Sequence, residues 1–289
     1  MKKFIISIDA GTTSNRAILF DLKGKPIFSS QKEFTQFFPK SGWVEHNPEE
    51  IWRTTKKVLK DVIAKANRLK GKILAIGITN QRETTVLWDK RTGKVVYKAI
   101  VWQDRRQAEY CKKLKKQNKE TIIFNKTGLP IDSYFSGTKI KWILDNVPAA
   151  KKLMNKKQLL FGTIDTFLIW RLTKGKVHAT DATNASRTMI YNISSNKWDD
   201  TILKILRIKK YILPEVKDCA DNYGSTHPSI TGKSIPITGV VGDQQSASIG
   251  QCCFEPGSFS NLSQELFYRS PCDHKFEHRQ FFSRLQKNI

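Results

Sequence analysis

Short apolar runs alternate with polar clusters along this chain of 289 residues, and most of the runs have the length of a β-strand. Residues 4–6 and 17–20 flank a polar turn at residues 9–16, a pattern that predicts two strands joined by a tight turn. The continuous apolar run at residues 73–78 predicts a strand that is buried on both faces. Further predicted strands cover residues 26–34, 86–88, 99–102, 159–162 and 235–241.

Amphipathic segments between these runs predict helices. Asn47 is a favourable N-cap, Pro48 suits the first helical position and Glu50 follows the cap by three residues, so a helix is expected to run to about residue 66. Its inner face is predicted to carry Ile51, Val58, Leu59, Val62 and Ile63. A lysine-rich helix is predicted to end near residue 117, and other helices to cover residues 136–146, 163 to 170 or 172, and 198–206. Residues 180–186 are predicted to form a polar loop.

The alternation of strands and helices indicates the α/β class. Polar clusters follow three of the predicted strands, at residues 9–16, 81–83 and 242–245. Ligands of α/β proteins bind where strands end, at one edge of the sheet. We therefore expect the three clusters to meet at one cleft.

The first cluster has the composition of a phosphate-binding turn. Gly11 lets the backbone turn sharply or approach a ligand closely. Successive amides of such a turn form an anion-binding concavity, which hydroxyls and a guanidinium extend. The side chains available for this are Thr12, Thr13, Ser14 and Arg16, and Asp9 offers a carboxylate for a metal ion or its water shell. The local pattern alone fits an ordinary hairpin with a polar turn equally well.

The net charge of +24 favours anionic partners, among which nucleic acid is the first candidate. The basic residues are spread widely, and runs such as residues 112–116 and 151–152 look like solvated helix faces. The chain shows no interleaved aromatic residues for base stacking and no nucleic-acid motif. Specific nucleic-acid binding is therefore not expected, and a compositional bias toward lysine is the simpler account.

The remaining composition is that of a globular chain, with 39% hydrophobic and 10% aromatic residues. No apolar run is long enough to span a bilayer, and the first residues do not have the pattern of a signal peptide. Five cysteines without a framework spacing fit a reducing, cytoplasmic setting. Metal-ligand types occur at Cys252, Cys253, Cys272, His274 and His278, but their spacing is not that of a standard zinc site.

Several longer motifs identify a family. The chain resembles the FGGY family of carbohydrate kinases, and within it the members that phosphorylate glycerol, over about residues 3–261. Residues 134–142 look like the family signature. The other stretches that carry the resemblance are residues 9–16, 42–46, 77–85, 161–166 and 242–245. Together these motifs are far more specific than a single glycine pattern, and Arg82, Glu83 and Tyr134 favour glycerol over larger sugars.

The resemblance implies a fold, cofactors and roles for individual residues. The implied fold is actin-like, with two ribonuclease-H-type domains around an ATP cleft, and this chain would carry the N-terminal domain as a mixed sheet flanked by helices. ATP and Mg²⁺ are the implied cofactors. Residues matching nucleotide-phosphate contacts are Thr12, Thr13, Ser14 and Arg16. Residues matching glycerol contacts are Arg82, Glu83, Trp102, Tyr134, Asp243 and Gln244. Asp243 matches the catalytic base, and Asp9 is expected to anchor Mg²⁺ indirectly.

The chemistry of glycerol fits these residue types. A triol offers only hydroxyl groups, so its recognition needs both donors and acceptors, and a site built to pair hydroxyls rejects analogues that lack them. Arg82 donates, whereas Glu83 and Asp243 accept. Asp243 can also take the proton from the attacking hydroxyl. The alternative interpretation of Arg82 and Glu83 as a surface ion pair has less weight, because the pair follows a buried strand.

Residues 262–289 depart from the family pattern. Members of the family continue past Asn261 with a Thr-Tyr-Gly-Thr-Gly-type loop that opens the second domain, which is absent from this chain. We therefore expect an N-terminal kinase domain at residues 1–261 and a divergent tail at residues 262–289. The genetic code allows a choice of codons for residues 263–268 that also encodes Thr-Gly-Thr-Phe-Leu when it is read from the last base of the Ser263 codon. This second reading is close to the family loop. A frameshift near Leu262 is thus a hypothesis, and a gene whose other frames encode no kinase C-terminal half contradicts it.

Two functions of different classes follow from these observations. The first is ATP-dependent phosphorylation of glycerol to glycerol 3-phosphate. The second is a catalytically inactive remnant that at most binds glycerol, because the second domain supplies the adenine site and half of the cleft wall. A homo-oligomer or a complementing C-terminal fragment is a possible partner, and no membrane span is expected.

The chain alone is predicted to have no measurable kinase activity, because cleft closure that excludes water needs both domains. A coupled assay of ADP release with purified protein measures this. The Asp243→Asn variant is the control, and turnover above that control contradicts the prediction.

Overall fold

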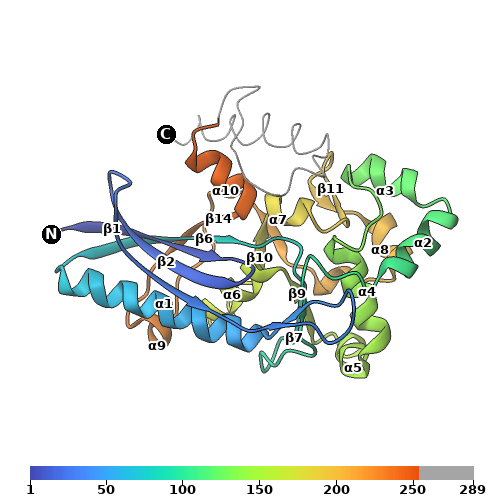
Figure 1. Cartoon of the computed structure of the whole chain (residues 1–289), viewed down its shortest axis with the longest axis horizontal. Helices are drawn as coiled ribbons and strands as arrows, with labels where there is room; N and C mark the ends of the chain where they lie inside the picture. Colours follow the sequence, from blue (N-terminus) through green and yellow to red (C-terminus); the bar gives the residue numbers. More distant parts are fainter. Residues whose placement is uncertain (254–289) are drawn as a thin grey trace.

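Five strands form the main sheet of the computed structural model, which describes residues 1–253 (Figure 1). Their order is β14-β6-β1-β2-β3, with bounds Ile237–Gly242, Lys72–Asn80, Lys3–Ala10, Ser14–Asp21 and Pro26–Glu33. The first three strands along the chain pair antiparallel, whereas β6 lies parallel to both β1 and β14. The sheet is therefore mixed and flanked by helices, as the resemblance implies.

The register of this sheet aligns the starts of the three polar clusters. Ala10 at the end of β1 pairs with Asn80 at the end of β6, and Asn80 pairs with Gly242 at the end of β14. The polar segments that follow these three residues consequently start from one edge of the sheet.

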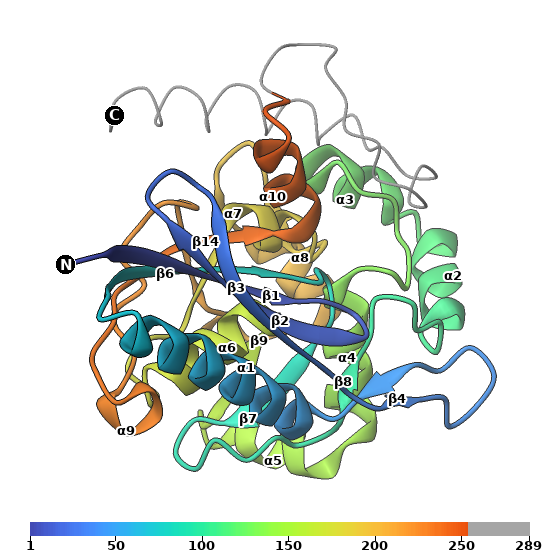
Figure 2. The ribbon, with the colours of Figure 1, turned by 60° about the vertical axis from the view of Figure 1, so that its left-hand side comes forward.

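Helix α1 (Pro48–Arg68) covers one face of the sheet, and α10 (Asp243–Gly250) lies on the other side (Figures 1 and 2). The predicted N-cap is confirmed, because Asn47 Oδ1 accepts a hydrogen bond of 3.0 Å from the Glu49 amide. All five residues predicted for the inner face of α1 are buried. Four of them, Val58, Leu59, Val62 and Ile63, pack in one core with apolar side chains of β1 and β2 such as Ile6, Ile8 and Leu19.

A second layer of structure lies beyond the end of α1 and carries its own apolar core around α4 and α8 (Figure 1). The helices outside α1 and α10 are α2 (Ala108–Lys116), α3 (Glu120–Thr127), α4 (Ser136–Asn146), α5 (Pro148–Asn155), α6 (Ile164–Leu172), α7 (Ala182–Ser186), α8 (Asp200–Leu206) and α9 (Pro228–Thr231), with a 3₁₀ turn η1 at Lys210–Ile212. The short strands are β4 (Gln36–Phe37), β5 (Glu45–His46), β7 (Val86–Asp89), β8 (Ala99–Ile100), β9 (Leu159–Gly162), β10 (Ala179–Asp181), β11 (Tyr191–Asn192), β12 (Lys197–Trp198) and β13 (Glu215–Lys217).

Three local predictions were wrong. Strand β6 is not buried on both faces, because Ile76 and Ile78 are buried while the residues between and before them keep partial exposure. Residues 180–186 form the end of β10 and helix α7 instead of a loop, because the Asp181 carboxylate accepts hydrogen bonds from the first amides of that helix. The predicted strand at residues 99–102 stops at Ile100.

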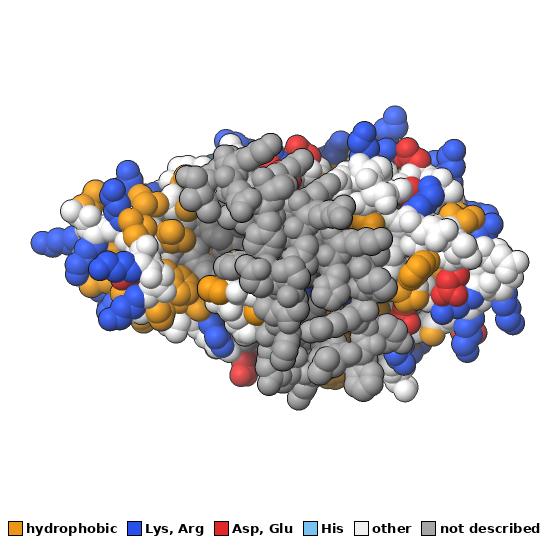
Figure 3. Space-filling model, turned by 90° about the horizontal axis from the view of Figure 1, so that it is seen from above, with side chains coloured by type: hydrophobic (Ala, Val, Ile, Leu, Met, Phe, Trp, Pro, Cys, Tyr) orange, Lys and Arg blue, Asp and Glu red, His pale blue; other side chains and the backbone are white. Residues whose placement is uncertain are grey.

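Some expectations lie outside the described residues, namely the tail at 262–289 and the metal-ligand types Cys272, His274 and His278. Within residues 1–253 no group of three or more His, Cys, Asp or Glu side chains is arranged to hold a metal ion, and the four cysteines there are free. No helix in that range is long and apolar enough to cross a membrane. On the described parts of the face in Figure 3, Lys and Arg side chains are dispersed toward both ends.

Deleting buried methyl groups from α1 tests this packing. The Leu59→Ala variant is expected to lose about 2–5 kcal/mol of unfolding free energy, because Leu59 is fully buried between α1 and the sheet. Urea unfolding followed by circular dichroism measures the loss. The neighbouring exposed residue provides the control, and an equal loss in Lys60→Ala contradicts the assignment of the buried face.

Candidate active site

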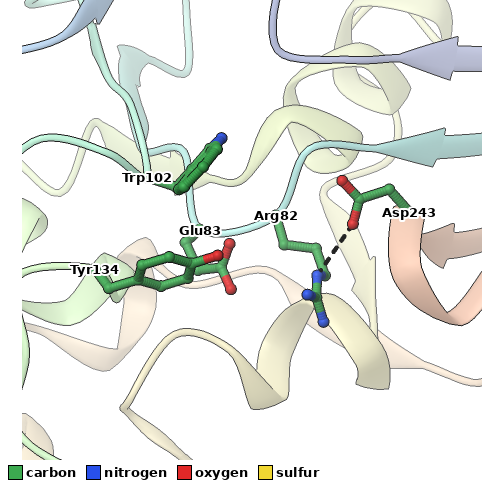
Figure 4. A pocket seen from close by; sticks show the side chains of 5 residues that line it. All are labelled: Arg82, Glu83, Trp102, Tyr134 and Asp243. Carbon is green, nitrogen blue, oxygen red and sulfur yellow. Dashed lines mark ion pairs between the residues drawn. The ribbon is translucent and has the colours of Figure 1, made fainter. Parts of the chain in front are cut away.

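A small pocket opens at the edge where the strands end, and Figure 4 shows the side chains that line it. They are Arg82, Glu83, Trp102, Tyr134 and Asp243. The structure thus brings together five of the six residues predicted to contact an alcohol. The sixth, Gln244, is the second residue of α10 and does not line the pocket.

Arg82 is the buried cation of the pocket, with a side chain only 2% exposed. Its Nε lies 3.2 Å from Asp243 Oδ1, and its Nη1 donates a hydrogen bond of 3.2 Å to Gln245 Oε1. The Asp243 side chain is 45% exposed, so its carboxylate lies at the rim while the guanidinium that holds it is buried. Figure 4 shows this ion pair as a dashed line. Both contacts of Arg82 are to the first turn of α10, which fixes this helix against the end of β6.

Glu83 has a different partner, Arg187, whose Nε lies 2.6 Å from Glu83 Oε1. Both side chains are almost completely buried, so the interpretation of Arg82 and Glu83 as one surface ion pair is wrong. The backbone of Glu83 is left-handed, with φ of 59°, a conformation that costs a non-glycine residue about 1–2 kcal/mol. Hydrogen bonds from the Ser136 and Thr85 hydroxyls to the Glu83 carbonyl hold this conformation in place.

Two aromatic rings form the apolar wall of the pocket. The ring centroids of Trp102 and Tyr134 are 5.5 Å apart and the planes are tilted by 51°. The Arg187 guanidinium lies 5.5 Å from the centre of the Tyr134 ring, so the cation that pairs with Glu83 also supports this ring. Trp102 additionally donates a hydrogen bond of 3.1 Å from Nε1 to Thr12 Oγ1.

Lys139 supports Tyr134 from behind. Its fully buried Nζ donates hydrogen bonds to the carbonyls of Ser133, at 2.6 Å, and of Tyr134. Burial lowers the pKa of the Lys139 amine to about 7, while the Glu83 carboxylate opposes this shift. The lysine therefore fixes the short segment that delivers the Tyr134 ring to the pocket.

The turn between β1 and β2 is bonded to the rest of the chain through its carbonyl groups. Gln81 Nε2 donates to the Gly11 carbonyl at 2.9 Å, and Gln36 Nε2 donates to the Thr12 carbonyl at 3.0 Å. The Thr13 carbonyl accepts from the Phe34 amide at 3.2 Å. With the carbonyls engaged on the protein side, the turn can offer amides and hydroxyls to an anion.

The other predicted residues of the turn are linked through one glutamine. Gln31 donates from Nε2 to Ser14 Oγ at 2.9 Å and accepts from Arg16 Nε at 3.0 Å. Asp9 lies opposite Arg16 in the antiparallel pairing of β1 with β2. Burial raises the pKa of the Asp9 carboxyl, and the Arg16 charge opposes that shift.

A buried network of amides and hydroxyls holds the strand ends together. The side chains of Asn80 and Asn184 exchange two hydrogen bonds, of 2.9 and 3.1 Å. Thr183 Oγ1 accepts from the Gly242 amide at 2.8 Å and donates to Asp181, which caps α7. The ends of β6 and β14 are thereby joined through one short helix.

Sequence reasoning missed Arg187, Lys139 and the bonding role of Gln81. Lys139 lies inside the signature segment at residues 134–142, and Arg187 directly follows the polar segment at residues 180–186. Neither residue type at these positions indicates by itself which group it will contact. One signal could have pointed to Arg187 and Lys139: a buried Glu83 carboxylate needs cations nearby to balance its charge.

His46 lies behind the turn and is completely buried. Its Nε2 is 2.6 Å from Gln36 Oε1, and its Nδ1 is 3.5 Å from Gln81 Nε2. A neutral ring that donates from Nε2 and accepts at Nδ1 satisfies both contacts. Burial lowers the pKa of His46 to about 4.

Known proteins are similar to this chain over almost all of its described residues. The model of the FGGY family of carbohydrate kinases, N-terminal domain, matches residues 4–250. The glycerol kinase of Rhizobium meliloti is 58% identical over 257 residues, which are 89% of this chain and 52% of that protein. The glycerol kinase of Petrotoga mobilis is 57% identical over 261 residues, which are 90% of this chain and 52% of that protein.

Two solved structures have folds similar to that of this chain. The crystal structure of Plasmodium falciparum glycerol kinase with ADP superposes with a TM-score of 0.84 at 38% identity, over 89% of this chain and 51% of that chain. The gluconate kinase of Lactobacillus acidophilus superposes with a TM-score of 0.75 at 27% identity, over 86% and 50% of the two chains. This chain spans about half the length of the curated relatives it matches.

The buried neutral state of His46 predicts how stability depends on pH. Between about pH 4 and 6.5 the unfolded chain binds a proton at this residue that the folded chain does not, so stability falls as the pH is lowered through this range. The full effect is about 3 kcal/mol. Urea unfolding at several pH values is expected to show a smaller slope for His46→Gln than for the wild type.

The remaining slope in that variant combines two groups of opposite sign. Burial lowers the pKa of His178 to about 4, which destabilises the fold as the pH falls, and raises the pKa of Asp165 to about 7, which stabilises it. Equal slopes in the wild type and in His46→Gln contradict the assignment to His46.

Proposed function

Since the chain belongs to the FGGY family of carbohydrate kinases, we propose that it forms the alcohol-binding half of a glycerol kinase, which converts ATP and glycerol to ADP and glycerol 3-phosphate. One observation carries this proposal. The pocket combines one buried cation, two carboxylates and two aromatic rings, next to a turn suited to phosphate. Relatives that share about 58% of the residues over this same length are glycerol kinases.

Glycerol fits the pocket by the pairing of its hydroxyl groups. Arg82 supplies donors, whereas Glu83 and Asp243 supply acceptors. The rings of Trp102 and Tyr134 face the carbon chain of the substrate. Gln244 is proposed as a further hydroxyl contact, from its position beside Asp243 on α10.

Asp243 is proposed as the base that takes the proton of the attacking hydroxyl. Its carboxylate lies at the pocket rim, where an alcohol and an incoming phosphate can both reach it. The buried Arg82 guanidinium fixes that carboxylate and orients it toward the substrate. Holding the two reactants in line is the main source of acceleration in phosphoryl transfer, so this orientation matters as much as the proton transfer.

The turn between β1 and β2 is proposed to hold the phosphates of ATP, through the side chains of Thr12, Thr13, Ser14 and Arg16. Asp9 fits the role of an indirect Mg²⁺ ligand, because its carboxylate is partly desolvated and a nearby cation relieves that cost. Mg²⁺ when bound neutralises phosphate charge. The residues of this chain orient the phosphates and the alcohol toward each other.

A chain that only binds glycerol is the second candidate function. The observation that favours it is that the lining of the pocket comes entirely from residues of this chain. We propose a reducing, cytoplasmic location for either function, which the free cysteines of residues 1–253 support. A complementing C-terminal fragment or a second copy of the chain is the proposed partner.

The proposed pocket is expected to bind glycerol more tightly than propane-1,2-diol by about tenfold or more, because the missing hydroxyl removes one hydrogen bond to a charged group of the pocket. Isothermal titration calorimetry on the whole chain measures both affinities. The Asp243→Asn variant is expected to reduce this discrimination, while the exposed surface change Asp145→Asn is expected to retain it.

Equal affinity for the two alcohols contradicts the proposed substrate. If the wild type binds glycerol but its turnover does not exceed that of the Asp243→Asn variant, the second candidate function, glycerol binding alone, is supported.

A further inference from the structure

A closed ring of hydrogen bonds joins the turn after β1 to the pocket. Trp102 donates from its indole Nε1 to Thr12 Oγ1 at 3.1 Å, and from its amide to Thr84 Oγ1 at 3.3 Å. Thr84 Oγ1 donates to Gln81 Oε1 at 2.7 Å, and Gln81 Nε2 donates to the Gly11 carbonyl at 2.9 Å. The peptide bond between Gly11 and Thr12 closes the ring.

The middle of this ring is shielded from water. Thr84 is fully buried and Gln81 is 1% exposed. A buried side chain that loses its hydrogen bond cannot replace it with water, so both residues resist a change of rotamer. The orientation of the Gln81 amide is fixed as well, because its oxygen accepts from a hydroxyl and its nitrogen donates to a carbonyl. The ring is therefore a rigid connection between the two sites.

Thr12 is the point where an anion can act on this connection. Its hydroxyl oxygen accepts from the indole, which directs the hydroxyl proton away from Trp102. No acceptor for that proton is found among residues 1–253, and an anion held by the turn can accept it. A hydroxyl that donates to an anion becomes a stronger acceptor, because hydrogen bonds in a chain polarise one another. The bond from Trp102 to Thr12 is then strengthened.

We propose that this ring couples the two sites, so that a phosphate-type anion at Thr12 tightens the binding of an alcohol beside Trp102. The anion fixes the indole ring that forms the wall of the alcohol pocket. Gln81 and Thr84 act as positioning residues, because they hold the backbones of the turn and of the Trp102 segment at a constant separation. This inference rests on the proposed function of both sites. Linkage requires that the alcohol tightens anion binding by the same factor.

Calorimetry with inorganic pyrophosphate as the anion tests the coupling. The whole wild-type chain is titrated with glycerol, in the absence of pyrophosphate and at a saturating concentration of it. The dissociation constant of glycerol is expected to fall about fivefold or more when pyrophosphate is present. In Thr84→Val, which removes the hydroxyl at the centre of the ring, the two constants are expected to differ by less than about twofold.

Two variants separate this coupling from a general loss of structure. Thr84→Ser keeps the hydroxyl and is expected to keep the coupling. Thr55→Val is the matched control, because Thr55 is equally buried on α1 and its hydroxyl has no hydrogen-bond partner among residues 1–253. Loss of coupling in Thr55→Val, or its retention in a folded Thr84→Val, overturns the proposal.

A second measurement does not depend on the folding of any ring variant. The ¹⁵N–¹H resonance of the Trp102 indole, identified by its absence from the spectrum of Trp102→Phe, is expected to shift when pyrophosphate is added to the wild type. An unchanged resonance at saturating pyrophosphate overturns the proposal. Binding of both ligands with independent affinities also overturns it and leaves the proposed function intact, whereas a wild type that binds neither ligand overturns both.

Discussion

The parallel pairing of β6 with both β1 and β14 is the constraint on which the site depends. Parallel strands run in one direction, so their carboxyl ends reach the same edge of the sheet. The register then sets Ala10, Asn80 and Gly242 in one row. A shift of one residue in either pairing would turn alternate side chains to the opposite face. The segment after β6 and the first turn of α10 would then no longer face one pocket, and the turn after β1 would no longer lie beside it.

Buried charged side chains maintain this arrangement, although their removal from water costs solvation free energy. Glu83 with Arg187, and Asp104 with Arg106, are ion pairs almost without exposure, and Lys139 is buried against carbonyls. Such pairs add little net stability, yet removing one partner leaves a charge in a medium that solvates it poorly. Their value here is geometric, because each fixes a segment that carries a pocket residue.

The sequence predicted those helices and strands that are determined by local features of their own residues. It also predicted the polar clusters that follow the ends of strands. Helix α1 is an example, because its cap and its apolar stripe are local features. Helix α7 was missed because it depends on the Asp181 cap and on packing against β14, and β6 was assigned too deep a burial because a run of apolar letters does not show which face a helix covers. Arg187 and Lys139 were missed because their partners lie far along the chain or on backbone carbonyls.

The geometry of the pocket is set by contacts within residues 1–253. The deeply buried polar groups around it, those of Gln81, Glu83, Thr84 and Lys139, all find their partners within residues 1–253. A buried group that needed a partner from elsewhere would be unstable here, and the segment carrying it would lose its conformation. Because the connection from the turn to the pocket is made of the same satisfied groups, the position of the turn relative to the pocket is set at one edge of the sheet.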